Sequence, residues 1–262
     1  MSAYGGYIRE KGLTLHSKRR TLMFRPCFLR LLRPLLPDMT WEMADRSSVY
    51  LTFDDGPTPG ITEWILKTLA GYGVRATFFC LGKNVEQHPD LYRAIADAGH
   101  KVGNHSYSHI KGWGMATGQY VADVDLANQL VESDIFRPPY GRIRRRQAEV
   151  LSERYRLVMG GIVSQDYSPS VTPQECLRNV TRYVDGGSIV VFHDSAKAFR
   201  NTEYALPRAI EYIAEAGFRF GTIGAAAEPV GPAAKGLHRP DGHRIEAEHP
   251  PLVGAGGLSG RY

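Results

Sequence analysis

The sequence has few cysteines and no long uninterrupted apolar run. Only three cysteines occur in 262 residues, at the widely spaced positions Cys27, Cys80 and Cys176. A sparse set of odd number excludes a disulfide framework and predicts reduced thiols. The most apolar candidate for a membrane span, residues 24–37, is broken by three arginines and three prolines. No membrane span is therefore predicted.

The N-terminal residues also lack the pattern of a secretory signal peptide. Such a peptide needs an unbroken apolar segment after a basic start and a cleavage site of small residues, and neither occurs here. We therefore expect a cytoplasmic protein, with a cell-envelope location as the alternative. The net charge of +5 is mild and indicates ordinary solubility, so no nucleic-acid partner is predicted.

Composition and length indicate one soluble domain with a large core. The chain has 262 residues, of which 43% are hydrophobic and 23% are charged. Residues 1–22 are basic and aperiodic, and we expect them to be poorly ordered. Residues 23–47 are predicted to cap a regular domain at 48–224, and 225–262 have the composition of a disordered tail. Within the cap, 27–36 has the pattern of an amphipathic helix, which either packs on the domain or lies on a membrane surface.

Strand and helix patterns alternate about seven times from residue 48 onward. Strands are predicted at 49–53, 74–81, 100–104, 134–137, 156–163, 188–192 and 217–222. Helices are predicted from Ile61 to a stop at Gly71, from Pro89 to a stop at Gly99, and at 118–133, 146–154, 173–185 and 204–216. This alternation predicts an α/β fold with parallel strands and right-handed crossovers. Both an open doubly wound sheet and a TIM-like barrel fit the pattern.

Polar side chains follow nearly every predicted strand, which favours the barrel. They are Asp54, Asp55, His105, His109, Arg137, Asp166, His193 and Asp194. The carboxyl ends of parallel strands converge on one face, where α/β folds build their sites. Residues far apart in the chain would then meet in one cleft.

The segment 49–57, VYLTFDDGP, leads an apolar run into two adjacent carboxylates and a Gly-Pro turn. Successive side chains of a strand point to opposite faces, so Asp54 and Asp55 are predicted to have different roles. An unpaired buried carboxylate is very costly. The adjacent acids therefore indicate a nearby cation.

Two histidines follow the third predicted strand at positions i and i+4. On one face of a helical turn, His105 and His109 can bind a single cation. With one carboxylate they form a two-histidine, one-carboxylate set that leaves coordination positions open. A pair with this spacing alone is more often structural. Beside Asp54 and Asp55 on the same predicted face, the metal interpretation is favoured.

Asp166 and His193 form a second predicted pair. His193 ends the strand at 188–192, and a carboxylate at one ring nitrogen would favour the charged imidazole of a proton donor. The alternative is a histidine with satisfied hydrogen bonds at a strand end. Arg137 has the geometry to hold a carboxylate. The two prolines after it leave Tyr140 as the next residue with a free N–H.

A basic cluster follows this loop. Arg142, Arg144, Arg145 and Arg146 lie at or before a predicted helix start, where the helix dipole does not favour cations. They either face an anionic polymer or form a solvated basic surface. The solvated surface is the simpler interpretation.

Five segments, in this order, resemble the polysaccharide deacetylases, also described as carbohydrate esterase family 4 or the NodB homology domain. They are TFDDGP at 52–57, HSYSH at 105–109, RPPYG at 137–141, SQDY at 164–167 and IVVFHD at 189–194. The resemblance covers about 49–222, nearly all of the regular domain. It implies a distorted TIM-like (β/α) barrel of seven or eight units and a catalytic domain at 48–224.

The resemblance also implies a divalent metal, most commonly zinc with cobalt or nickel as alternatives, held by Asp55, His105 and His109. Asp54 is implied as the general base that takes a proton from the metal-bound water, with Arg137 holding it in place. The implied reaction removes N-acetyl groups from a peptidoglycan- or chitin-like glycan. Its products are acetate and a free amino sugar.

The remaining implied roles concern proton donation and the acetyl group. His193 would protonate the leaving amine, with Asp166 orienting it, and the Tyr140 backbone N–H would share the oxyanion. The substrate pocket is implied to be lined by Pro139, Tyr167 and Val191.

Two departures from the family pattern concern the acetyl pocket. Gly160 and Tyr167 stand where the family usually has tryptophans, and Val191 stands where it often has leucine. The pattern therefore leaves open a wider pocket, with an O-acetyl ester of the xylan type or a small amide as substrate. A haloacid-type phosphatase is disfavoured because such enzymes place a residue between their two acids. A catalytically inactive glycan-binding module is disfavoured because the base, metal and acid positions are all filled.

Overall fold

The computed structural model describes residues 39–224. The predicted extension at 1–22, the amphipathic segment at 27–36 and the tail at 225–262 lie outside the described residues. No helix between residues 39 and 224 is long and apolar enough to cross a membrane.

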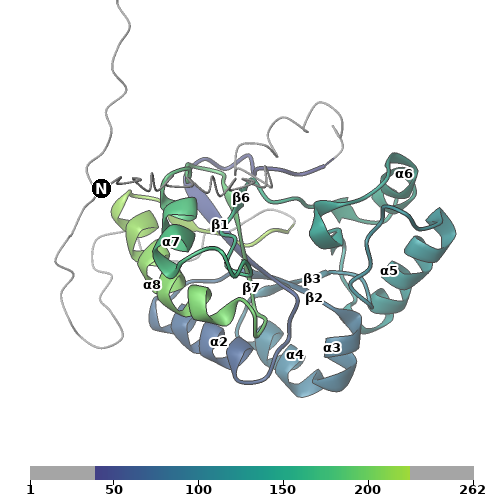
Figure 1. The fold of residues 1–262 in the computed structure, drawn as a ribbon, viewed down its shortest axis with the longest axis horizontal. Coiled ribbons are helices and arrows are strands. Elements are labelled where there is room, and N and C mark those ends of the chain that lie inside the picture. Colours follow the sequence, from purple (N-terminus) through teal and green to yellow (C-terminus); the bar gives the residue numbers. More distant parts are fainter. Residues whose placement is uncertain (1–38, 225–262) are drawn as a thin grey trace, which may run out of the picture.

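A curled parallel sheet forms the centre of the molecule, and the helices surround it (Figure 1). The strand order is β5-β4-β3-β2-β1-β7-β6, with β8 paired to β1. The strands are β1 (Ser48–Asp54), β2 (Thr77–Cys80), β3 (Lys101–Asn104), β4 (Ile135–Phe136), β5 (Arg156–Leu157), β6 (Ile162–Val163), β7 (Ile189–His193) and β8 (Arg219–Phe220). The helices are α2 (Ile61–Gly71), α3 (Gly82–Gln87), α4 (Pro89–Asp97), α5 (Thr117–Val131), α6 (Arg145–Ser152), α7 (Pro173–Thr181) and α8 (Phe199–Glu215). This architecture confirms the predicted distorted (β/α) barrel in a single domain.

Strand β1 lies inside the sheet between β2 and β7, and all seven of its residues are buried. It pairs in parallel with β2 on one side and with β7 on the other. Strands buried on both faces have near-continuous apolar sequences, which is the pattern of its first residues. The register sets Asp54 opposite His193. Two of the predicted site residues therefore stand side by side at the ends of neighbouring strands.

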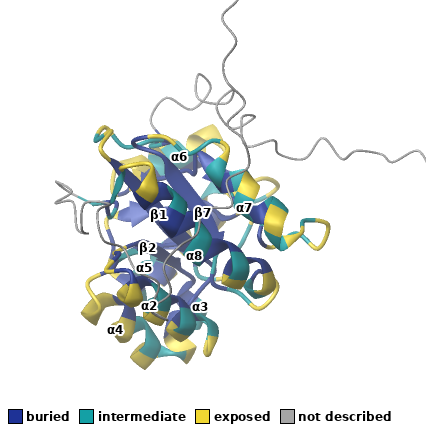
Figure 2. Cartoon of the chain, turned by 90° about the vertical axis from the view of Figure 1, so that its left-hand side faces the viewer, coloured by how far each residue is buried: buried dark blue, intermediate teal, exposed yellow. Residues whose placement is uncertain are grey.

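The main core lies between the sheet and the helices. The ring of Phe53 on β1 stacks on Phe78 of β2 and Phe192 of β7, with centroid distances of 4.9 and 6.1 Å. Helix α8 adds apolar side chains such as Leu206 and Ile210, which are fully buried. Figure 2 shows buried strands at the centre and helices with exposed outer faces. Aromatic packing across three strands therefore fixes the register that sets the site.

The predicted strand at 156–163 is wrong, because these residues form two strands at opposite edges of the sheet. β5 pairs with β4, and β6 pairs with β7. In the link between them, Val158 forms an isolated β-bridge with Thr40, and the Met159 N–H donates to the Thr40 carbonyl. The apolar run that follows Arg156 does not reveal such a crossing, because Leu157, Ile162 and the link between them are all buried.

The predicted strand at 74–81 is too long, since β2 begins at Thr77. The Val74 N–H donates to the Leu69 carbonyl, which ends α2, and the Ala76 N–H donates to the ring of His100. These amides are therefore unavailable to a strand ladder. Helix α3 was not predicted, and α8 begins at Phe199 rather than at 204.

Candidate active site

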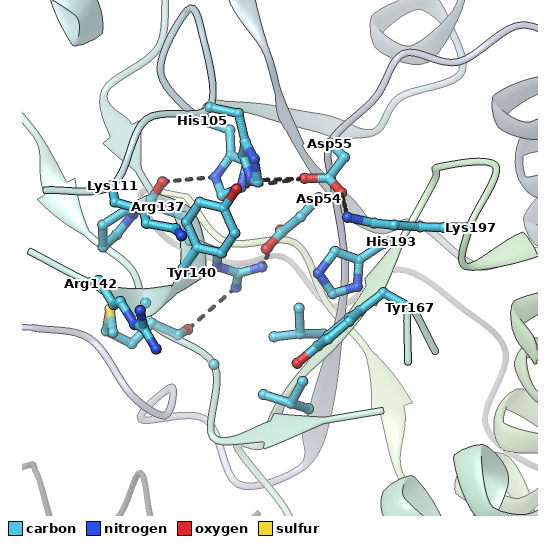
Figure 3. A pocket seen from close by; sticks show the side chains of 17 residues that line it. Asp54, Asp55, His105, Lys111, Arg137, Tyr140, Arg142, Tyr167, His193 and Lys197 are labelled. Carbon is cyan, nitrogen blue, oxygen red and sulfur yellow. Dashed lines mark hydrogen bonds and ion pairs between the residues drawn. The ribbon is translucent and has the colours of Figure 1, made fainter. Parts of the chain in front are cut away.

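A cavity of about 380 Å³ opens at the carboxyl ends of the strands (Figure 3). The predicted site residues that line it are Asp54, Asp55, His105, His109, Arg137, Tyr140, Tyr167, Val191 and His193. Two predicted residues do not line it. Asp166 is fully buried behind His193, and Pro139 is buried beside the lining residue Pro138. Pro139 begins the tight turn next to the cavity, and its role as a pocket residue stays a prediction.

One carboxylate and two imidazoles converge at one end of the cavity. Asp55 Oδ1 lies 3.2 Å from His109 Nε2 and 3.8 Å from His105 Nε2. One ligand atom from each of the three residues falls within 4.8 Å of the others. Asp55 Oδ1 is buried and accepts no hydrogen bond from the described residues.

These three residues fit a divalent cation. The carbonyl of Arg137 lies 2.8 Å from His105 Nδ1, so that nitrogen carries the hydrogen and Nε2 presents its lone pair to Asp55. Burial lowers the pKa of His105 to about 4, which keeps the ring neutral at pH 7. A lone pair facing a buried carboxylate oxygen is repulsive unless a cation lies between them. Lys197 Nζ is 3.9 Å from Asp55 Oδ2, but its side chain is 59% exposed, so its charge is largely screened.

The two histidines lie in a loop, not on the predicted helical turn. Ser106 and His109 have positive φ angles of 65° and 59°. The Asn104 side chain accepts from the Ser106 N–H, and the Ser106 hydroxyl accepts from the His109 N–H. Side-chain hydrogen bonds thus replace a helical ladder. The i, i+4 spacing brings the two rings together through this loop, with their centroids 5.3 Å apart.

Asp54 is held by a buried ion pair. Arg137 Nη1 lies 2.6 Å from Asp54 Oδ1 and also donates to the Thr52 hydroxyl at 2.7 Å. The guanidinium lies 4.1 Å from the ring centroid of Phe79 and donates to the Met159 carbonyl. Its position is therefore set by packing as well as by charge. Asp54 faces this arginine while Asp55 faces the histidines, so the adjacent acids have different partners.

His193 is held by Asp166 on the other side of the cavity. Its Nδ1 is 2.7 Å from Asp166 Oδ1, and its backbone N–H donates to Asp166 Oδ2. The Thr202 hydroxyl also donates to that carboxylate. Burial disfavours the charged imidazole, but the Asp166 carboxylate outweighs it and raises the pKa of His193 to about 9. With Nδ1 bound to Asp166, Nε2 is the atom left to carry a proton toward the cavity.

Tyr140 lies on a tight turn with a φ angle of 60°. Its N–H donates no backbone hydrogen bond within residues 39–224, whereas Gly141 and Arg142 donate to Pro138 and Pro139. Its ring is 4.5 Å from that of His109. Left-handed conformations of residues other than glycine concentrate at functional sites, and Asp55 adopts one as well.

Sequence reasoning missed several residues around the cavity. Lys111 and Lys197 line it. Each follows a predicted site residue, His109 or His193, by a few residues, and this nearness was the signal in the sequence that could have identified them. Asp194 follows His193 at the end of the same strand, and the sequence pattern assigns it no role. Its buried carboxylate accepts from the Gly56 N–H at 2.8 Å and the Thr62 hydroxyl at 2.7 Å. Burial raises the pKa of Asp194 to about 8, although both donors oppose this change.

Comparisons with known proteins agree with this geometry. The polysaccharide deacetylase family model matches residues 42–155. A peptidoglycan-N-acetylglucosamine deacetylase of Bacillus cereus is 31% identical over 187 residues, covering 68% of each chain. A chitooligosaccharide deacetylase of Rhizobium leguminosarum bv. trifolii is 35% identical over 162 residues, covering 58% of this chain and 73% of that one.

A solved structure extends the likeness to the fold. A family 4 carbohydrate esterase from Streptomyces lividans, in complex with acetate, is 31% identical with a TM-score of 0.63. The match covers 72% of this chain and 99% of that one. This chain therefore belongs to the polysaccharide deacetylase family, carbohydrate esterase family 4.

Proposed function

We propose that this chain is a metal-dependent hydrolase that removes N-acetyl groups from an N-acetylated amino-sugar glycan of the peptidoglycan or chitin type. The observation that carries the proposal is the Asp55, His105 and His109 cluster, which shares one cavity with Asp54 and His193. Relatives named as deacetylases of peptidoglycan and of chitooligosaccharides support this substrate class.

Asp55, His105 and His109 would hold the divalent ion, for which zinc is proposed and cobalt or nickel are alternatives. When bound, such an ion polarises an acyl oxygen and lowers the pKa of a water molecule. Three protein ligands leave positions for water and substrate. The Arg137 carbonyl orients the ring of His105 by accepting its Nδ1–H, as the outer partners of ligating histidines commonly do.

The chain's own groups then handle the protons. Asp54, fixed by Arg137, takes a proton from the attacking water, whose oxygen bonds to the acetyl carbon. The Tyr140 N–H donates to the oxyanion, an interaction typically worth about 3 kcal/mol. His193 Nε2 gives its proton to the sugar nitrogen as the C–N bond breaks, while Asp166 holds the ring. The second hydrogen of the water stays on the acetic acid, which ionises to acetate as the released amine takes up a proton. The proton held by Asp54 returns to His193 through solvent, so atoms and charge balance.

The same groups would hydrolyse an O-acetyl ester or a small amide, so the acyl pocket decides the substrate. A Cβ at Gly160 would lie 2.2 Å from Val191 Cγ2. Val191 therefore takes part of the space that a larger residue at 160 would fill. Tyr167 is edge-on to His193, with ring centroids 4.9 Å apart. These side chains support a walled acetyl pocket rather than the wider one expected from the departures alone.

The test couples metal analysis to acetate release from N-acetylglucosamine oligomers, acetylated xylan and small N-acetyl amides. We expect Asp54→Asn to lose turnover while keeping the metal, and His105→Ala to lose both. His88→Ala is the matched control, because His88 caps α4 without a side-chain bond, and it should keep both. Metal loss in Asp54→Asn would reassign that residue as a ligand. Full activity after chelation would refute the metal-dependent mechanism. Acetate release from acetylated xylan alone would show that the substrate is an O-acetyl ester and not an N-acetyl amide.

A further inference from the structure

Two cations line the cavity without a carboxylate partner. Lys111 and Arg142 are among its lining residues, and neither forms an ion pair with an acid between residues 39 and 224. The two lining acids are already engaged. Asp54 binds Arg137 at 2.6 Å, and Asp55 faces the imidazoles. Uncompensated positive charge at a concave surface attracts anions.

Each of these cations lies against an exposed aromatic ring. Lys111 Nζ is 4.9 Å from the ring centroid of Tyr140, and Arg142 Cζ is 5.3 Å from that of Trp113. Trp113 is 61% exposed and Tyr140 is 49% exposed. Exposed aromatic rings grouped beside a cavity mark a binding surface. Their flat faces suit the apolar face of a sugar ring.

The loops that carry these residues are fastened to each other. The Gly112 N–H donates to the Arg142 carbonyl at 3.1 Å, and the Gln147 side chain donates to the Gly112 carbonyl at 2.9 Å. The indole N–H of Trp113 donates to the Ile143 carbonyl. The backbones of the two loops and the indole of Trp113 are therefore held in place before a ligand arrives, which lowers the entropic cost of binding.

The rest of the basic cluster does not share this position. Arg144, Arg145 and Arg146 are exposed and do not line the cavity, and Arg145 pairs with Glu149 at 2.9 Å. The cluster identified in the sequence thus divides into one arginine at the cavity and three on the solvated surface. Arg145 supplies a matched control for Arg142.

We infer that Lys111, Trp113, Tyr140 and Arg142, which we call the cationic wall, bind a carboxylate-bearing sugar next to the residue that is deacetylated. The inference rests on the proposed function and specifies its substrate class as an acidic N-acetylated glycan. A neutral glycan offers these cations hydroxyl oxygens as acceptors but no negative charge. A carboxylate can bind the guanidinium with two hydrogen bonds and the ammonium as a point charge.

Figure 3 shows Lys111, Tyr140 and Arg142 on one side of the site and Lys197 and Tyr167 on the other. The wall therefore borders the cavity on the side of the histidine loop. The acetyl pocket proposed above is walled by Val191 and Tyr167, beside His193. Of the wall, only the Tyr140 backbone N–H is assigned to the reacting acetyl group, so its side chains are left to recognise a neighbouring sugar.

The experiment uses the zinc-loaded full chain and two matched substrates. These are N-acetylglucosamine oligomers with some C6 positions oxidised to carboxylates, and the methyl esters of the same oligomers. We expect kcat/KM to be about tenfold higher for the acid, mostly through KM, because two partly exposed ion pairs contribute to binding. The ratio should fall with added salt. It should approach one in Lys111→Gln/Arg142→Gln and persist in Arg145→Gln.

A second readout separates this inference from the proposed function. Equilibrium binding of both oligomers to Asp54→Asn measures the preference without turnover. Tighter binding of the acid than of the ester, lost when Lys111 and Arg142 are replaced, supports the inference. If the parent chain then releases no acetate from either oligomer, only the proposed function fails. Equal binding of acid and ester overturns the inference, as does a preference that survives in the double variant. Deacetylation of both oligomers with equal kcat/KM would overturn the inference and leave the proposed function intact.

Discussion

The pair of His193 and Asp166 permits a quantitative test of proton donation. Replacing Asp166 with Asn keeps the size of the side chain but removes the charge that lies 2.7 Å from His193 Nδ1. Asp166 is fully buried, so solvent screens this interaction little. Burial of His193 disfavours the charged ring, and in this variant the Asp166 carboxylate no longer offsets that effect. The pKa of His193 is therefore expected to fall.

The size of the change follows from the pKa of His193. Its rise from 6.5 to about 9 corresponds to about 3 kcal/mol in favour of the charged ring. Without the Asp166 carboxylate, we expect the ring to titrate below about pH 7. The alkaline limb of kcat should move down by about two pH units, because the donor must carry a proton when the amine leaves.

The assay is the pH dependence of acetate release by the parent and by Asp166→Asn, with the imidazole titration followed by NMR in the metal-free chain. Thr202→Val is the control, since it removes a neutral donor to Asp166 at 2.8 Å but keeps the charge. The alkaline limb of kcat in Thr202→Val should stay within about half a pH unit of that of the parent. An unchanged limb in Asp166→Asn would refute the assignment of His193 as the donor.

The same pKa predicts how the stability of the metal-free chain depends on pH. Because the folded pKa of His193 lies above its ordinary value, its contribution to the free energy of unfolding is fully present below pH 6.5. It is lost as the pH rises through about 9, and amounts to about 3 kcal/mol. Urea unfolding in chelator should show this loss in the parent and much less of it in Asp166→Asn. A flat profile in the parent would contradict the raised pKa.

Three other substitutions test the packing that supports the site. Burial and the charge of Arg75 lower the pKa of His100 to about 4. Its contribution to the free energy of unfolding is therefore present above pH 6.5 and is lost as the pH falls through 4, by about 3 kcal/mol. Urea unfolding of His100→Asn should show a much smaller loss over this pH range than the parent shows. Asp194→Ala should lower the free energy of unfolding by about 2–4 kcal/mol, because two buried donors lose their acceptor, and calorimetry showing less than 1 kcal/mol would contradict this. Gly160→Ala should cost about 1–3 kcal/mol through its contact with Val191, and Val191→Ala in the same chain should recover part of it; additive losses in thermal melts would disprove the contact.

The sequence alone determined the fold class and most residues of the site. Alternating strand and helix patterns predict parallel strands, and these bring strand-end residues to one face. Asp54, Asp55 and His193 therefore meet at one cavity, as expected from their places at the carboxyl ends of β1 and β7. The family motifs extended this to Arg137 and its neighbours.

Only the tertiary structure decided where buried segments run and how side chains pair. After Arg156, the run 157–163 is apolar throughout, so its period does not show that 156–163 divides between the two edges of the sheet. Lys111 stands alone in its loop, and Arg142 is one of four arginines in a basic cluster, so the sequence does not single out either one. Their shared position depends on hydrogen bonds between the two loops, and such long-range contacts leave no local pattern in the chain.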